Sequence, residues 1–319
     1  MPVERSAEHA NVADSAARPT FMFDSDFLKQ LEYLSLLSKR MFQGQLLAQR
    51  RTMQTGGGIE FSDHREYMHG DDLRYLDWNV YARHGDLLLK RFQEEEDLHV
   101  YLLLDVSQSM EVDETFATAE AADPPKFKLA RQIAAALAYI ALADLDRVSI
   151  VAYADGVKVV MPLVRGKDQI LSVLRFLEGL KCHGERTDLR RTVGEFVGRA
   201  PRTGLAIIIS DLFDQDGFRE GVDRLRYAQF EPHVIQIHTR QEADPKLLGD
   251  VQLVDCETGT EKKVTVTERK LRHYKQLFET FVQEVETYCR THGLAHTRTT
   301  TDVPFDAVLL KMMRAAAVG

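Results

Sequence analysis

The residues best suited to chemistry lie where one apolar run ends. The run 100–104 stops at Asp105, and two serines follow at alternate positions, Ser107 and Ser109. If this run is a buried strand, three oxygen-bearing side chains lie where the strand opens into a loop. Mg²⁺ prefers oxygen ligands in near-octahedral geometry and keeps several waters. The D-x-S-x-S segment is therefore expected to form part of a divalent-cation site.

A second apolar run ends in the same way. Residues 205–210 form a run rich in Ile that leads directly into Asp211. In α/β sheets, ligands bind beyond the carboxyl ends of the strands, at a switch point in strand order. We therefore expect Asp105 and Asp211 to lie at one edge of the same sheet.

Alternating strands and helices must position these carboxylates. The strands are expected at Leu98–Asp105, Arg147–Ala154, Val157–Met161, Leu205–Asp211 and His233–His238. The helices between them are expected at Pro125–Leu145, Lys167–Leu180, Leu189–Arg199 and Gly217–Ala228. Strands of near-continuous Val, Ile and Leu that alternate with amphipathic helices predict an α/β fold. We expect a doubly wound, mostly parallel, Rossmann-like sheet flanked by helices.

The flanking segments complete a three-part organisation. Residues 1–20 are polar and predict a disordered tail, not a signal peptide. Residues 21–97 are expected to hold a helix at Phe27–Arg51, a break at 56–58 and an irregular segment, all packed on the sheet. Residues 98–319 form the α/β domain. Its later elements are a hairpin (Val251–Asp255 and Lys263–Thr267), a long helix (Glu268–His292), a strand (Ala295–Thr300) and a helix from Pro304.

The composition is that of a soluble globular protein. The chain has 319 residues, of which 44% are hydrophobic and 28% charged, and its formal net charge is -8. No broad basic surface for nucleic acid is indicated. Cys182, Cys256 and Cys289 are too far apart for a C-x-x-C metal motif and too few for a disulfide framework. The longest apolar stretch elsewhere, 133–143, is shorter than the roughly 20 residues of a membrane span. We expect a cytoplasmic chain that contacts no membrane.

A third element carries a resemblance to a known domain class. Thr187 precedes an expected helix, within the segment 184–189. A D-x-S-x-S loop, a threonine from a second loop and an aspartate after a later strand resemble the metal-ion-dependent adhesion site of von Willebrand factor A (vWA) domains. The resemblance implies metal ligands at Asp105, Ser107, Ser109, Thr187 and Asp211. It implies Mg²⁺ as the cation, with Mn²⁺ or Ca²⁺ as alternatives, and one open position for a partner's carboxylate.

Each of these residues also has a simpler interpretation. Asp105 could cap a turn, and Ser107 and Ser109 could satisfy loop amides. Thr187, followed by Asp188, could be the N-cap of the next helix.

A second motif set covers more of the chain. The segments 58–67 and 70–79, followed by Ala82-Arg83, resemble the signature of the domain-of-unknown-function 58 family of bacteria and archaea. The resemblance extends from about Phe27 to the end of the chain. It implies partnership with a MoxR-type AAA+ ATPase in maturation or regulation of an unidentified client protein.

The signature segment Glu60–Arg83 has two interpretations of its own. Its carboxylates, with His64 or His69, could serve as acid and base. Alternatively, an Arg–carboxylate network pins the segment against the sheet, with Trp78 as the packed anchor. We favour the network.

Three functions follow as candidates. The first is a non-enzymatic, metal-dependent protein-interaction module, an adaptor or co-chaperone for the ATPase, docked by a partner's acidic side chain. The second is a metal-dependent hydrolase of phosphatase type using Asp105 and Asp211. Ser107 stands where haloacid-dehalogenase-type phosphatases have a second aspartate, which removes the acid/base group such chemistry needs. The third is a scaffold with a degenerate metal site. No P-loop motif is present, so ATP would be hydrolysed by another chain.

Overall fold

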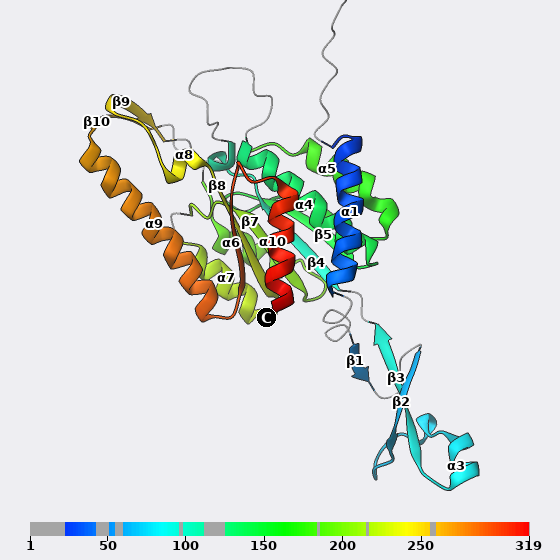
Figure 1. Ribbon diagram of the computed structural model, residues 1–319. Helices are drawn as coiled ribbons and strands as arrows, with labels where there is room; N and C mark the ends of the chain where they lie inside the picture. The colour runs from blue at the N-terminus through cyan, green and yellow to red at the C-terminus, as the bar shows by residue number, and fades with distance from the viewer. Residues whose placement is uncertain are drawn as a thin grey trace, which may run out of the picture.

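A six-stranded sheet forms the centre of the molecule in the computed structural model (Figure 1). The structure describes residues 23–42, 51–54, 60–95, 98–111, 125–183, 186–214, 217–255 and 260–318. The strand order is β11-β8-β7-β4-β5-β6. The strands are β4 (His99–Asp105), β5 (Arg147–Tyr153), β6 (Val157–Arg165), β7 (Leu205–Ser210), β8 (Glu231–His238) and β11 (Ala295–Thr300). All neighbours pair in parallel except β5 and β6, which are antiparallel.

Helices cover both faces of this sheet, and each face has its own core. The first core is formed with α1 (Ser25–Phe42), α4 (Pro125–Ala143), α5 (Ile170–Gly179) and α10 (Phe305–Val318). The second is formed with α6 (Leu189–Val197), α7 (Phe218–Tyr227) and α9 (Glu268–Thr291). Alternate residues of β4 enter opposite cores: Leu102 packs in the first and Leu103 in the second. The predicted α/β architecture with a mostly parallel, helix-flanked sheet is confirmed.

The expected elements of residues 98–319 all form, with shifted ends. The largest shift is at β6, which continues past Met161 to Arg165. The added residues include Pro162, which cannot donate a ladder hydrogen bond. Pro162 falls within a register shift of the β5–β6 pairing, between Met161 and Val164, and β6 is the edge strand of the sheet, so proline is tolerated there.

The hairpin predicted before the long helix is also present. It consists of β9 (Gly249–Val254) and β10 (Glu261–Val266), and α8 (Arg240–Ala243) precedes it. Its turn, 256–259, lies outside the described residues, as do Cys256 and the tail 1–20. Among the described helices, none has both the length and the apolar character needed to cross a membrane.

Residues 51–54 and 60–95 form a separate projection, here called the arm. Its antiparallel sheet has the order β1-β3-β2, from β1 (Arg51–Gln54), β2 (Glu60–Glu66) and β3 (Leu88–Glu95). The short helices η1 (Leu73–Tyr75) and α3 (Trp78–His84) lie between β2 and β3. Figure 1 shows the arm extending away from the body of the protein.

The arm corrects two expectations. First, α1 ends at Phe42, and residues 51–54 are a strand, so the expected helix Phe27–Arg51 is too long. The expected break at 56–58 lies outside the described residues. Second, the signature segment is not an irregular extension packed on the sheet. Residues 62–66 of β2 are all polar, so no alternation of apolar and polar side chains marks this strand in the sequence.

The predicted polar network exists but holds the arm itself together. Arg65 pairs with Asp71 at 2.7 Å. Asp77 caps α3 through the N–H groups of Asn79 and Val80, and its Oδ2 lies 3.0 Å from His64 Nε2. The His64 contact, aided by the α3 cap and by Lys90, lowers the pKa of Asp77 to about 2. His64 therefore contributes to the structure of the arm through its contact with Asp77.

The predicted packed anchor is wrong. The Trp78 side chain is 60% exposed and contacts Tyr81 edge-on, at 6.2 Å between ring centroids. The arm's ion pairs form within the arm itself, and the indole stays exposed to solvent.

Candidate metal site

Asp105, the last residue of β4, is completely buried. Its Oδ1 accepts the Ser107 N–H at 2.8 Å, and its Oδ2 accepts the Ser210 hydroxyl at 2.6 Å. Ser210 ends β7, which pairs in parallel with β4. The two strands therefore bring Asp105 and the residue next to Asp211 into direct contact at the carboxyl edge of the sheet, as the sequence predicted.

The two serines lie in the turn that follows. Ser107 is completely buried and Ser109 nearly so, and their hydroxyl oxygens lie 3.0 Å apart. The simpler interpretation is right for Asp105, which does accept a turn amide. The serine hydroxyls, however, bond to each other. The result is a pair of neutral oxygen donors beside a buried carboxylate.

Asp211 is also buried, and a lysine contacts it. Its Oδ1 accepts the Phe213 N–H at 3.1 Å, and its Oδ2 accepts a hydrogen bond from Lys126 Nζ at 2.8 Å. Lys126 lies in the first turn of α4 and is fully buried. Sequence reasoning missed this residue. Lys126 is one of several basic residues in the first two turns of α4, where a lysine is usually solvated, so its sequence carries no distinct signal.

Thr187 is buried, and its Oγ1 has no hydrogen-bond partner in the described part of the chain. Asp188, the next residue, is the N-cap of α6: its side chain accepts the Arg191 N–H at 2.7 Å. The capping interpretation therefore does not account for Thr187. A buried hydroxyl without a partner costs about 1–3 kcal/mol, so a ligand bound at this oxygen would be favourable.

Backbone hydrogen bonds hold the Thr187 loop beside the other donors. The His183 N–H donates to the Val106 carbonyl at 2.6 Å, and the Asp188 N–H donates to the Ala154 carbonyl at 2.9 Å. Val106 and Ala154 directly follow the ends of β4 and β5. The predicted donors on three segments thus converge on the carboxyl ends of neighbouring strands.

Burial, together with the nearby Asp211 carboxylate, raises the pKa of Asp105 to about 7. Lys126 compensates Asp211, but among the described residues no side-chain cation pairs with Asp105. Neutral hydroxyls and carboxylates are the donors that hard divalent cations take, so the set fits such an ion. The described residues contain no group of three or more His, Cys, Asp or Glu that could hold a metal.

Thr187→Val is expected to weaken Mg²⁺ binding about tenfold, a loss of about 1.4 kcal/mol. It should leave metal-free stability unchanged or slightly higher, because valine removes a buried unpaired hydroxyl. Calorimetric titration and thermal unfolding measure both quantities.

The matched control is Thr192→Val, because Thr192 Oγ1 is also buried without a partner, on α6. Equal weakening of Mg²⁺ binding in both variants would contradict a ligand role for Thr187.

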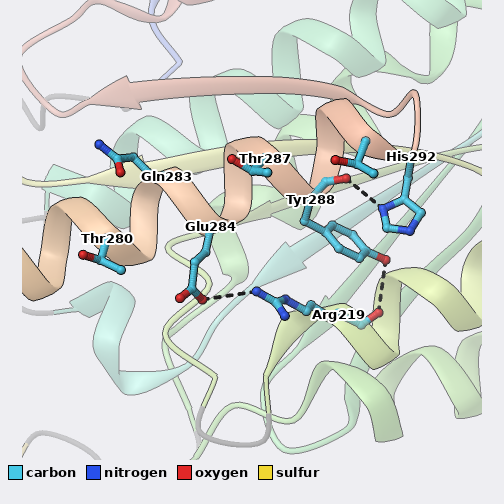
Figure 2. Close-up of a pocket in the computed structure, with 8 residues that line it drawn as sticks. Arg219, Thr280, Gln283, Glu284, Thr287, Tyr288 and His292 are labelled. Carbon is cyan, nitrogen blue, oxygen red and sulfur yellow. Dashed lines mark hydrogen bonds and ion pairs between the residues drawn. The ribbon is translucent and has the colours of Figure 1, made fainter.

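A hollow of about 410 Å³ lies elsewhere, between α7 and α9 (Figure 2). Arg219 and Glu284 form an ion pair across it at 3.2 Å, and the Tyr288 side chain lies beside them. None of the predicted site residues lines this hollow.

The fold and the site together define an α/β protein with buried carboxylates and hydroxyls at the carboxyl ends of its central strands. Residues 63–284 match the family described as protein of unknown function DUF58, and the chain belongs to that family. Proteins Mb1516 of Mycobacterium bovis and Rv1480 of Mycobacterium tuberculosis, both termed uncharacterized, are each 25% identical over 245 residues. The match covers 76% of this chain and 75% of either relative.

Solved structures with a related arrangement include the conserved hypothetical protein BatB from Bacteroides thetaiotaomicron. It is 12% identical, with a TM-score of 0.42, over 70% of this chain and 100% of that one. An aerotolerance-related membrane protein from Bacteroides fragilis is 12% identical, with a TM-score of 0.43, over 68% of this chain and 97% of that one.

Proposed function

We propose that this chain is a non-enzymatic, divalent-cation-dependent protein-interaction module of the vWA type, with Mg²⁺ as its physiological cation. The ligands are Asp105, Ser107, Ser109, Thr187 and Asp211. The observation that carries the proposal is the buried, unpartnered Thr187 hydroxyl, held beside a buried carboxylate that no side-chain cation compensates in the described structure.

The donor set favours docking over hydrolysis. Hydroxyl ligands are neutral, so a bound cation keeps more of its charge than it would among carboxylates alone. An incoming Asp or Glu of a partner protein then gains strongly by completing the coordination. This chain's residues bind and orient the cation, and the partner supplies the last oxygen.

The arm supports an adaptor role because it offers a second surface. β4 begins at His99, just after the arm, and ends at Asp105, so the arm and the metal site lie at opposite ends of one strand, about 20 Å long. Among the described side chains of the arm, the large apolar ones that are exposed are Met68, Leu73, Trp78, Tyr81 and Leu87. Two of them, Trp78 and Tyr81, contact each other, and adjoining exposed apolar groups are typical of interaction surfaces.

We propose that the two surfaces serve two partners, a MoxR-type AAA+ ATPase and a client protein. The metal site takes the partner that offers an acidic side chain. The test is capture by the immobilised full-length chain from an extract of the native host, followed by identification of the bound proteins. An AAA+ ATPase should be bound in Mg²⁺. An extract in which no AAA+ ATPase is retained under any condition would contradict the partnership.

Trp78→Ala is expected to weaken capture of one of the two partners about 30-fold, because a central tryptophan of an interface typically contributes 2 kcal/mol or more. Thermal stability should change by less than about 0.5 kcal/mol, as for other surface substitutions. Binding of Mg²⁺ should stay as in the unaltered chain.

Tyr227→Ala is the control for this variant, since Tyr227 is an exposed aromatic residue on α7, at 85% exposure. Equal losses of capture in the two variants would show that the arm has no special part in binding.

A further inference from the structure

Lys126 is a feature of the site that the proposed function does not use. Its Nζ lies 2.8 Å from Asp211 Oδ2 and 2.5 Å from Glu242 Oε1, and its side chain is fully buried. Nζ also lies 5.5 Å from the centre of the Phe213 ring. A single internal ammonium group is thus shared by a predicted metal ligand and a second carboxylate on α8.

We propose that Lys126 is a positioning residue that competes with the divalent cation for Asp211, and that Glu242 sets the strength of that competition. This inference rests on the proposed metal-binding function. It assigns to Lys126 and Glu242 the control of how tightly the site holds its cation.

The competition follows from the charges. Asp105, Asp211 and Glu242 against Lys126 leave two formal negative charges in excess, which one divalent cation neutralises. A buried ammonium group must stay paired, because an isolated buried charge is very costly. When a cation approaches Asp211, Lys126 can therefore yield only if another carboxylate holds it.

Glu242 is held in a position where it can keep the Lys126 ammonium group paired when a cation binds Asp211. Its Oε2 accepts the Thr239 N–H at 2.7 Å, and its own N–H donates to Thr239 Oγ1 at 3.0 Å, which forms a capping box at the start of α8. The Tyr274 hydroxyl of α9 donates to the Glu242 carbonyl at 2.9 Å. The second carboxylate is thus anchored by α8 and α9, independently of Lys126.

Two single variants should shift Mg²⁺ affinity in opposite directions. Lys126→Met removes the competitor, so Mg²⁺ should bind about tenfold more tightly. Glu242→Gln leaves Lys126 with Asp211 alone, so Mg²⁺ should bind about tenfold more weakly. Glutamine also serves at this position of a capping box, so α8 should persist. Lys128→Met is the control, because Lys128 is exposed on the same helix.

The double variant separates this competition from long-range electrostatics. If Glu242 acts through Lys126, Glu242→Gln should change Mg²⁺ affinity less than about twofold in the Lys126→Met background. A simple charge effect would give the same change in both backgrounds and would overturn the inference.

Four further outcomes decide between the inference, the proposed function and their alternatives. Lys126→Met affinity equal to or below that of the unaltered chain would overturn the inference. If Lys126→Met does not fold, Lys126→Gln replaces it in the single and the double variant, and unchanged or tighter Mg²⁺ binding by Glu242→Gln overturns the inference by itself. An unaltered chain that binds no Mg²⁺ overturns the proposed function itself. Normal binding by the unaltered chain with no shift in either variant overturns only the role of Lys126 and Glu242.

Discussion

Asp105→Asn is expected to abolish Mg²⁺ binding and Mg²⁺-dependent partner capture while the protein stays folded. The carboxylate is the one buried anion of the site that no side-chain cation compensates among the described residues, so its removal leaves little to attract a dication. A cation present at about 100 times its dissociation constant stabilises the native state by about 2.7 kcal/mol. In the unaltered protein this should raise the melting temperature by about 4–6 °C. In Asp105→Asn the increase should disappear.

Asp26→Asn is the matched control, because Asp26 is exposed on α1 and contacts only Lys29 nearby. It should keep the full response to Mg²⁺. If Asp105→Asn captured the partner in Mg²⁺ as well as the unaltered chain, metal-dependent docking at this site would be wrong.

In the metal-free protein, Asp105 is expected to lower stability as the pH rises from about 4 to about 7, against an opposite contribution from His233 and His238, whose burial lowers their pKa to about 4. Burial and the nearby Asp211 raise the pKa of Asp105 from 3.8 in the unfolded chain to about 7 in the folded one. Between these values this carboxyl binds more protons in the native state than in the unfolded state, so its contribution to the free energy of unfolding falls with increasing pH. That contribution is about 4 kcal/mol, since one pKa unit corresponds to about 1.4 kcal/mol, and it is the difference in pH dependence between the unaltered chain and Asp105→Asn.

Urea unfolding in a chelator at several pH values measures this dependence. A saturating divalent cation should remove it, because the cation favours the ionised carboxylate. Asp105→Asn should remove it as well, since the amide does not titrate. An equal slope in Asp105→Asn and the unaltered chain would show that another group is responsible.

The donors of the site could be predicted from the sequence because each is marked locally. Asp105 and Asp211 end near-continuous apolar runs, and such runs form buried parallel strands with their carboxyl ends at one edge. Thr187 stands before an amphipathic helix, where a loop must return to that edge. Each of these signals spans only a few residues of the sequence.

Lys126 could not be predicted in this way. Its partners, Asp211 and Glu242, are 85 and 116 residues away in the sequence, so only the packing of α4 against the sheet and α8 reveals the pairing. A lysine in a first helical turn is ordinarily solvated.

The arm escaped prediction for a different reason. Residues 62–66 of β2 are uniformly polar, so the period of two that marks a half-buried strand is absent. The dense charges of the segment suggested a network against the body of the protein, whereas they pair within the arm and leave Trp78 exposed.

The most direct test of metal-dependent docking at this site is a titration of Mn²⁺ into chelator-stripped full-length protein, followed by electron paramagnetic resonance, with Mg²⁺ as competitor. Free and bound Mn²⁺ give distinct signals, so the number of sites is counted directly. We expect one saturable site per chain, displaced by Mg²⁺ and absent in Asp105→Asn. No saturable binding, or a site that persists unchanged in Asp105→Asn, would contradict the assignment.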